Sequence, residues 1–296
     1  MPTSQDILNS AIVRLKQHME NAEFLMEVSL VALIKLVELE QQTIAEIFHL
    51  SEIEIRKLSE NNIKQLMDMI QQEGGGKLIL RHGGQDPGMA IVGLNSVQQK
   101  ILMMQRDHNV GDPTSIQSAL ESIGTLWTIV YLKRRLNSSI IVHSSINCRA
   151  KQPASAIAQV LSIPLQLSST LDCINYPDQL DPLLMQKLQG GTLPWNETIV
   201  DEVVGQGTFR QILTGMQQIK DQFIPKNQIN IFITHTQQIQ AFLQLSQPDS
   251  NPNLRLSFYG FLFATQKKFL LFQEGFYSTD LLILQPEATT SLSFQP

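Results

Sequence analysis

Four side chains of two types, arginine and histidine, follow three short apolar runs of the sequence. They are Arg81, His82, Arg149 and His235, and the runs span residues 77–80, 139–143 and 229–234. Arginine presents a planar fork of donors that matches the oxygens of a phosphate. An imidazole with one free nitrogen is a nucleophile, and a second imidazole can donate to phosphoryl oxygens as charge builds in the transition state. Together these side chains are suited to holding and taking up a phosphoryl group.

The four side chains are expected to meet because the three runs are typical of buried strands in one sheet. Apolar residues recur at helical spacing between these runs and after them, which predicts helices over residues 95–106, 115–136, 151–161, 208–222 and 237–245. Two late runs, 255–264 and 268–274, indicate paired strands. Strands that alternate with helices predict a three-layer α/β/α fold with a largely parallel sheet. Such sheets bind ligands at the carboxyl ends of their strands, where the four side chains fall.

Small and hydroxylated residues accompany this set. Gly83 follows His82, and a glycine there lets the backbone approach a ligand closely. Ser145 comes after the second run, and Thr236 follows His235. We predict that Gly83, Ser145 and Thr236 contact the bound group.

The same segments resemble the three motifs of the histidine phosphatase superfamily, whose fold is phosphoglycerate mutase-like. The matching segments are Leu80-Arg81-His82-Gly83, residues 142–150 and residues 232–235, with residues 258–260 similar to the closing strands of the family. The resemblance covers about residues 77 to 275, so residues 77–296 are expected to form one histidine-phosphatase-like domain.

By this resemblance, His82 would be the phosphorylated nucleophile, in a pocket formed by Arg81, Arg149 and His235. The resemblance implies a phosphatase that acts on a phosphomonoester or on a phosphorylated protein side chain. Its partner would be a phosphorylated small molecule or a phosphoprotein. No metal or organic cofactor is expected, because the arginines neutralise the charge that a metal would.

The general acid of the family has no clear counterpart here. Many members carry a glutamate at the position that Cys173 occupies, and another branch carries an acid where this chain has Thr236. Asp172 is adjacent to the first of these positions and is the candidate acid. Further carboxylates without a motif are Asp178, Asp181, Asp201 and Glu202. General acid catalysis contributes about 10²–10⁴-fold. The alternative is therefore a catalytically impaired binding or regulatory module.

Residues 1–73 lie outside the resemblance and are expected to form an all-helical extension. They hold 12 acidic and 6 basic residues, so the acidity of the chain is concentrated there. Ser51 and Glu54 fit a capping box that would begin a helix, and Gly74-Gly75-Gly76 is expected to be a boundary and a hinge. The extension could pack on the main domain, form a homodimer or dock a partner.

Composition excludes several classes of protein. The formal net charge of -5 and the absence of a basic stripe argue against nucleic-acid binding. The most apolar stretch, residues 24–39, contains Glu27, Lys35 and Glu38, and is too short and too charged to span a membrane. Neither cysteine has a metal-ligand spacing. The expected location is the cytoplasm.

Overall fold

The computed structural model describes most of the chain: residues 2–20, 27–50, 53–84, 113–172, 197–247, 256–266 and 268–283. The helix predicted over residues 95–106 and the position of Cys173 lie outside the described residues. In the described part of the chain, no helix has the length and apolar character needed to cross a membrane.

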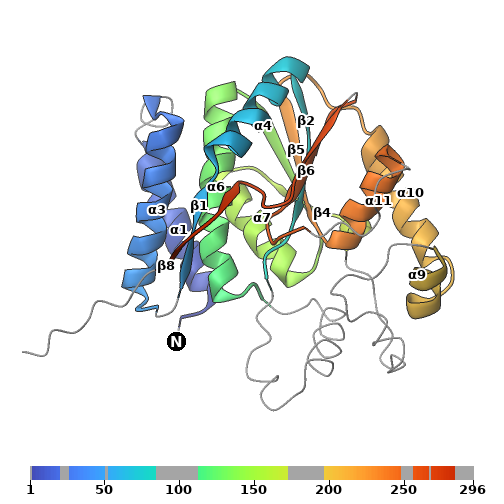
Figure 1. Ribbon diagram of the computed structural model, residues 1–296, viewed down its shortest axis with the longest axis horizontal. Helices are drawn as coiled ribbons and strands as arrows, with labels where there is room; N and C mark the ends of the chain where they lie inside the picture. The colour runs from blue at the N-terminus through green and yellow to red at the C-terminus, as the bar shows by residue number, and fades with distance from the viewer. Residues whose placement is uncertain are drawn as a thin grey trace, which may run out of the picture.

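A six-stranded sheet lies at the centre, in the order β4-β3-β5-β2-β6-β7 (Figure 1). Its strands are β2 (Gly75–Arg81), β3 (Ser139–Ser144), β4 (Leu165–Leu167), β5 (Gln228–Thr234), β6 (Phe261–Ala264) and β7 (Phe269–Phe272). The strands β2 to β5 pair in parallel, whereas β6 and β7 are antiparallel. Arg81 is in register with Thr234, so β2 and β5 end level with each other at one edge of the sheet.

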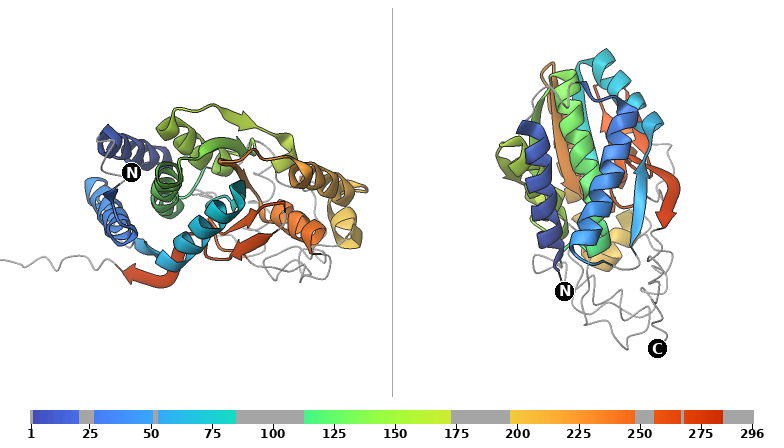
Figure 2. Two further views of the ribbon diagram at one scale, coloured as in Figure 1. Left: turned by 90° about the horizontal axis from the view of Figure 1, so that it is seen from above. Right: turned by 90° about the vertical axis from the view of Figure 1, so that its left-hand side faces the viewer.

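Helices cover both faces of this sheet, which confirms the predicted three-layer α/β/α fold (Figure 2). On one side lie α4 (Glu60–Glu73), α6 (Ile116–Leu136) and α7 (Cys148–Leu161); on the other lie α9 (Glu197–Val204), α10 (Thr208–Asp221) and α11 (Thr236–Ser246). Alternate strand residues supply the two cores: Leu78 and Leu80 face the first set of helices, and Ile79 faces the second.

The N-terminal helices α1 (Ser4–Glu20) and α3 (Leu30–Ile47) form a further layer outside α6 (Figures 1 and 2). Their buried residues, such as Leu15 and Leu33, belong to the same hydrophobic cluster as Trp127 of α6. The extension thus shares a core with the main domain. Dimerisation and docking through it stay predictions.

The expectation that residues 1–73 are all helical is wrong, because a strand interrupts them. The strand β1 (Glu54–Leu58) pairs antiparallel with β8 (Tyr277–Ile283), and no helix begins at Glu54. Ile55 and Leu58 are buried. A short segment becomes a strand when a partner strand and a packing surface are present, and neither is visible in the local sequence.

The glycine triplet is a tight junction and not a hinge. Gly74 ends α4 with a left-handed φ of 75°, and its N–H donates to the carbonyl of Ile70. Gly75 has a φ of 137°, and a Cβ there would lie 2.4 Å from the carbonyl oxygen of Gln228. These glycines are required because the chain turns from α4 directly into the central strand.

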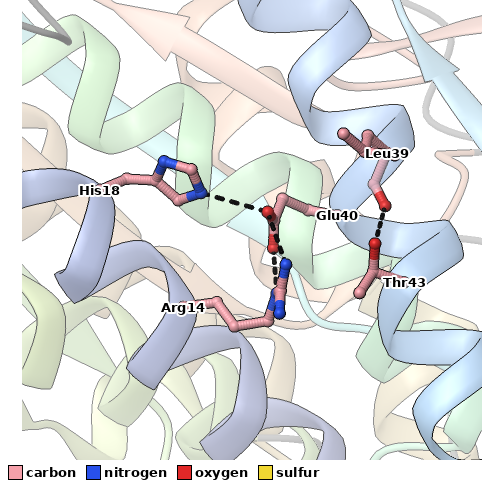
Figure 3. Close-up of polar contacts among 5 residues, drawn as sticks. All are labelled: Arg14, His18, Leu39, Glu40 and Thr43. Carbon is pink, nitrogen blue, oxygen red and sulfur yellow. Dashed lines mark hydrogen bonds and ion pairs between the residues drawn. The ribbon is translucent and has the colours of Figure 1, made fainter.

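A buried carboxylate ties the two N-terminal helices together (Figure 3). Glu40 of α3, whose side chain is 3% exposed, accepts from Arg14 Nε at 2.5 Å and from Arg14 Nη2 at 3.1 Å. Nε2 of His18 lies 3.2 Å from the same carboxylate. The carboxylate is therefore paired on the inner side of the outer helical layer.

Replacing Glu40 by glutamine is expected to lower the free energy of unfolding by about 1.5–3 kcal/mol, because hydrogen bonds to a charged group are lost where water cannot replace them. Urea unfolding monitored by circular dichroism measures this change. Glu46→Gln, on the exposed face of the same helix, is the matched control and should shift stability by less than about 0.5 kcal/mol. Equal effects of the two substitutions would contradict the prediction.

Candidate active site

The loops that follow β2 and β5 bring two histidines together. The N–H of His82, one residue after β2, donates to the carbonyl of Thr234 at 3.0 Å, which extends the pairing of the two strands by one residue. His235 follows β5 directly and is the N-cap residue of α11. The centroids of the two imidazole rings lie 4.6 Å apart. Both histidines are buried, with exposed fractions of 3% for His82 and 1% for His235.

The tautomer of His82 is fixed by its own loop. Nδ1 of His82 lies 2.5 Å from the carbonyl oxygen of Gly83. A carbonyl can only accept, so Nδ1 carries the proton and donates. Nε2 therefore keeps its lone pair. A histidine in this state is a competent nucleophile.

The structure requires a glycine at position 83 for a reason that differs from the predicted one. A Cβ at Gly83 would lie 2.4 Å from the hydroxyl oxygen of Tyr259. That hydroxyl donates to the carbonyl of Ser118 at 2.7 Å, so Tyr259 is fixed against the loop. The absence of a side chain at Gly83 therefore leaves room for the hydroxyl of Tyr259 beside the loop that carries His82. Contact of Gly83 with a ligand stays a prediction.

Arg81 lies beside the histidines and is held from two sides. One terminal N–H donates to the carbonyl of Leu256, and the guanidinium carbon lies 4.4 Å from the centroid of the Phe258 ring. The ring of Phe258 is also 6.3 Å from that of His82. Burial, followed by repulsion from Arg149, lowers the pKa of Arg81 to about 10, so it remains charged at neutral pH. Its buried Nε has no hydrogen-bond partner within the described structure.

Phe258 was predicted to lie in a strand and was not predicted to contact the site. Residues 258–260 instead form a turn and its exit before β6, which begins at Phe261. The turn is tied to β2, because the N–H of Arg81 donates to the carbonyl of Gly260 at 2.9 Å. An aromatic residue in a run of apolar residues carries no signal that it will cover a guanidinium.

Arg149 enters the site from the first turn of α7. This helix begins at Cys148, three residues earlier than predicted, and contains Pro153. A proline has no N–H for the carbonyl four residues before it. The carbonyl of Arg149 accepts instead from the hydroxyl of Thr114 at 3.3 Å. The repulsion of Arg149 on His82, His235 and Arg81 indicates that all four side chains share one site.

Ser145 connects His235 to a carboxylate. Nε2 of His235 lies 3.1 Å from the hydroxyl oxygen of Ser145, which lies 2.9 Å from Oδ1 of Asp172. The N–H of Ile146 donates to the same carboxylate oxygen at 2.8 Å. Burial raises the pKa of Asp172, and these two hydrogen bonds oppose the rise. Asp172 thus reaches the site through Ser145, whose hydroxyl is engaged within the protein.

The remaining candidates are distributed differently. Thr236 is buried beside His235, and its contact with a ligand stays a prediction. Asp201 accepts from the N–H groups of Gly207 and Phe209, so it orders the entry to α10. Glu202 is exposed, while Asp178 and Asp181 lie outside the described residues. Among the described residues, no three histidine, cysteine or acidic side chains gather as metal ligands.

The burial of the two histidines predicts a loss of stability in acid. Burial, together with the positive charges around them, lowers the pKa of both His82 and His235 well below 6.5. The unfolded chain therefore binds more protons than the folded chain below about pH 6.5, and stability present above that pH is lost as the pH falls. Each histidine should contribute a slope of up to about 1.4 kcal/mol per pH unit.

Urea unfolding between pH 7.5 and 5 tests this dependence. His235→Gln should reduce the slope of stability against pH by about 1.4 kcal/mol per unit. His49→Asn is the control, because His49 is exposed and asparagine tolerates its left-handed φ of 50°. An unchanged slope in His235→Gln would show that His235 does not stay neutral in the folded chain.

No protein-family model matches this chain, and no curated protein matches its sequence. Solved structures do align with it. A mycobacterial glucosyl-3-phosphoglycerate phosphatase aligns at a TM-score of 0.44 and 11% identity, over 67% of this chain and 98% of its own. A phosphoserine phosphatase from Entamoeba histolytica aligns at a TM-score of 0.37 and 15% identity, over 69% and 98%.

A phosphoglycerate mutase from Bacillus anthracis aligns at a TM-score of 0.38 and 9% identity, over 69% of this chain and 94% of its own. All three alignments have TM-scores below 0.5. The likeness concerns the fold alone. What the site of this chain can do follows from its own geometry.

Proposed function

We propose that this chain is a phosphatase that hydrolyses a phosphomonoester or a phosphorylated protein side chain through a phosphohistidine on His82. The observation that carries the proposal is the buried imidazole of His82, whose Nδ1 lies at hydrogen-bond distance from the Gly83 carbonyl, so that Nε2 keeps its lone pair. Two guanidinium groups and a second imidazole surround it. This set matches a phosphoryl group in charge and in donors.

In the first step, the lone pair of His82 Nε2 forms a bond to phosphorus as the bond from phosphorus to the leaving oxygen breaks. The electron pair of that bond stays on the leaving oxygen, which takes up a proton from water and departs as the alcohol. Arg81 and Arg149 neutralise the charge on the phosphoryl oxygens. The hydrogen bond to Gly83 stabilises the cationic imidazole of the phosphohistidine.

In the second step, water attacks phosphorus and the bond from phosphorus to Nε2 breaks. The electron pair returns to Nε2, the attacking water loses a proton, and inorganic phosphate is released. His82 is regenerated in the tautomer that it had at the start. No metal takes part in either step, because the two guanidinium groups offset the phosphoryl charge.

The alternative function is a catalytically impaired module that binds a phosphoryl group without turnover. The observation that favours it is the cysteine at position 173, where the resemblance places a carboxylic acid. A thiol, with a usual pKa of about 8.5, protonates a leaving oxygen poorly. Substrates with good leaving groups, such as aryl or acyl phosphates, need little such help and are the best probes of activity.

Rapid-quench trapping with a labelled aryl phosphate, without metal, tests the proposed function. The phosphatase should accumulate label on the protein that is stable in alkali and lost in acid, as expected of a phosphohistidine. It should also release phosphate through repeated turnovers. Tight binding of phosphate without labelled protein and without turnover would contradict the phosphatase proposal and favour the binding module.

A further inference from the structure

The hydroxyl of Ser145 has more partners than it has protons. It lies 2.6 Å from Oδ1 of Asn147 and 2.9 Å from Oδ1 of Asp172, and both of these oxygens accept. It also accepts from the N–H of Asn147 at 3.1 Å. A serine has one proton and two lone pairs. Its proton goes to Asp172, because a carboxylate is a stronger acceptor than an amide oxygen. One lone pair accepts from the N–H of Asn147, and the other remains for Nε2 of His235.

This count fixes the tautomer of His235. Nε2 lies 3.1 Å from Ser145 Oγ and must carry the proton if Ser145 is to accept it. Nδ1 then holds a lone pair. Nδ1 is a buried atom without a hydrogen-bond partner within the described structure, which agrees with this assignment. An unpartnered nitrogen in a site that binds an anion is prepared to accept a proton when the anion arrives.

Hydrogen bonds to the backbone at residues 171 and 172 hold Asp172 in place beside Ser145. The side chain of Gln238 donates to the carbonyl of Asp172, and the hydroxyl of Thr234 donates to the carbonyl of Leu171 at 2.8 Å. These donors come from β5 and α11, the two elements that flank His235. The backbone that carries Asp172 and the imidazole of His235 are therefore positioned by the same pair of elements.

We propose that Asp172 is a positioning residue that acts through Ser145, so that His235 takes up a proton at Nδ1 when a phosphoryl group binds. Among the described residues, the charged or titratable groups that face His235 are His82, Arg81 and Arg149 within the pocket, and Asp172 through Ser145. The bound dianion offsets the repulsion of the arginines. Asp172 stabilises the resulting imidazolium, whose Nδ1–H can then donate to a phosphoryl oxygen. The proposal rests on the proposed function only in that the pocket binds a phosphoryl group.

Binding of sulfate isolates this proton, because sulfate is a tetrahedral dianion that does not titrate near neutral pH. The measurement is isothermal titration calorimetry in two buffers of different ionisation enthalpy, on full-length His82→Asn, in which His82 cannot take up a proton. Sulfate should bring about one proton onto this variant at pH 7.5, because the pKa of His235 rises on binding. Adding Asp172→Asn or Ser145→Ala should reduce the uptake to less than about half.

Asp172→Asn keeps an oxygen that accepts from Ser145 and Ile146, so it removes the charge and preserves the fold. Asp201→Asn is the matched control, since Asp201 also accepts two hydrogen bonds, from the N–H groups of Gly207 and Phe209, but lies on α9. It should leave the uptake unchanged. Uptake that stays near one proton in both Asp172→Asn and Ser145→Ala would overturn the proposal, as would no uptake in the starting variant.

The same residues should move the pH profile of turnover. In the otherwise wild-type chain, Asp172→Asn should shift the alkaline limb of kcat to lower pH by about one unit, because the imidazolium loses an opposite charge. A purely structural role would lower kcat at every pH without this shift, and that result would overturn the proposal. Proton uptake without any phosphoenzyme would instead contradict the proposed phosphatase function and still support the role of Asp172.

Discussion

Replacing His82 by asparagine is expected to reduce kcat for an aryl phosphate by about 10⁴-fold or more, because the atom that forms the bond to phosphorus is removed. Asparagine is small and polar enough to fit the buried position. Its amide has no nitrogen lone pair able to attack. The measurements are initial rates between pH 5 and 8 and trapping of labelled protein, and the label should vanish together with turnover.

His143→Asn is the control for this substitution. His143 lies on β3, outside the pocket. Its ring stacks on that of Phe232, with the two ring centroids 4.6 Å apart. It should change kcat by less than a few fold, as expected of a substitution that touches no reacting group. Equal rates in His82→Asn and the wild type would show that the hydrolysis arises elsewhere in the chain or from a contaminant.

Arg81→Gln should lower kcat by about 10²–10³-fold and weaken phosphate binding, because it removes a preorganised donor from the charge that develops on the phosphoryl group. Glutamine can still donate one hydrogen bond but brings no charge. Arg81→Lys should recover only part of the loss, since a lysine has neither the planar fork nor the flat contact with Phe258.

Steady-state rates and calorimetry with inorganic phosphate measure the two effects of Arg81→Gln. Arg210→Gln is the control, because Arg210 is 79% exposed and pairs with Glu197 on the surface. It should leave both quantities within a factor of two. A loss of binding alone, at unchanged kcat, would mean that Arg81 holds the ground state and transition state equally well.

The sequence predicted the residues of the site that directly follow a single strand or lie in the loop after it. Apolar runs ended at Arg81 and preceded Arg149 and His235, and parallel strands bring such ends together whatever the side chains between them. The layers on both faces of the sheet followed from alternation of strands and helices. Local pattern was sufficient because each element buries its own apolar face.

The contacts between the motifs could not be predicted in this way. Ser145 meets His235 across 90 positions of the chain and Asp172 across 27. A hydroxyl has no periodicity that reveals its partners. The stacking of Phe258 on Arg81 and the blocking of a side chain at Gly83 by Tyr259 depend in the same way on tertiary packing.

The pairing of β1 with β8 also has a consequence for how the chain folds. Asn62 donates to the carbonyl of Gly275, 213 positions away, at 2.9 Å, next to where the two strands meet. Closing so long a loop costs little more than closing one of half the length, about 0.6 kcal/mol, but non-local pairing is slow to form. During synthesis, β1 is made before β8, and it cannot pair until the chain between the two strands has also been made. Until β8 arrives, its open edge is a place where two unfinished chains can associate.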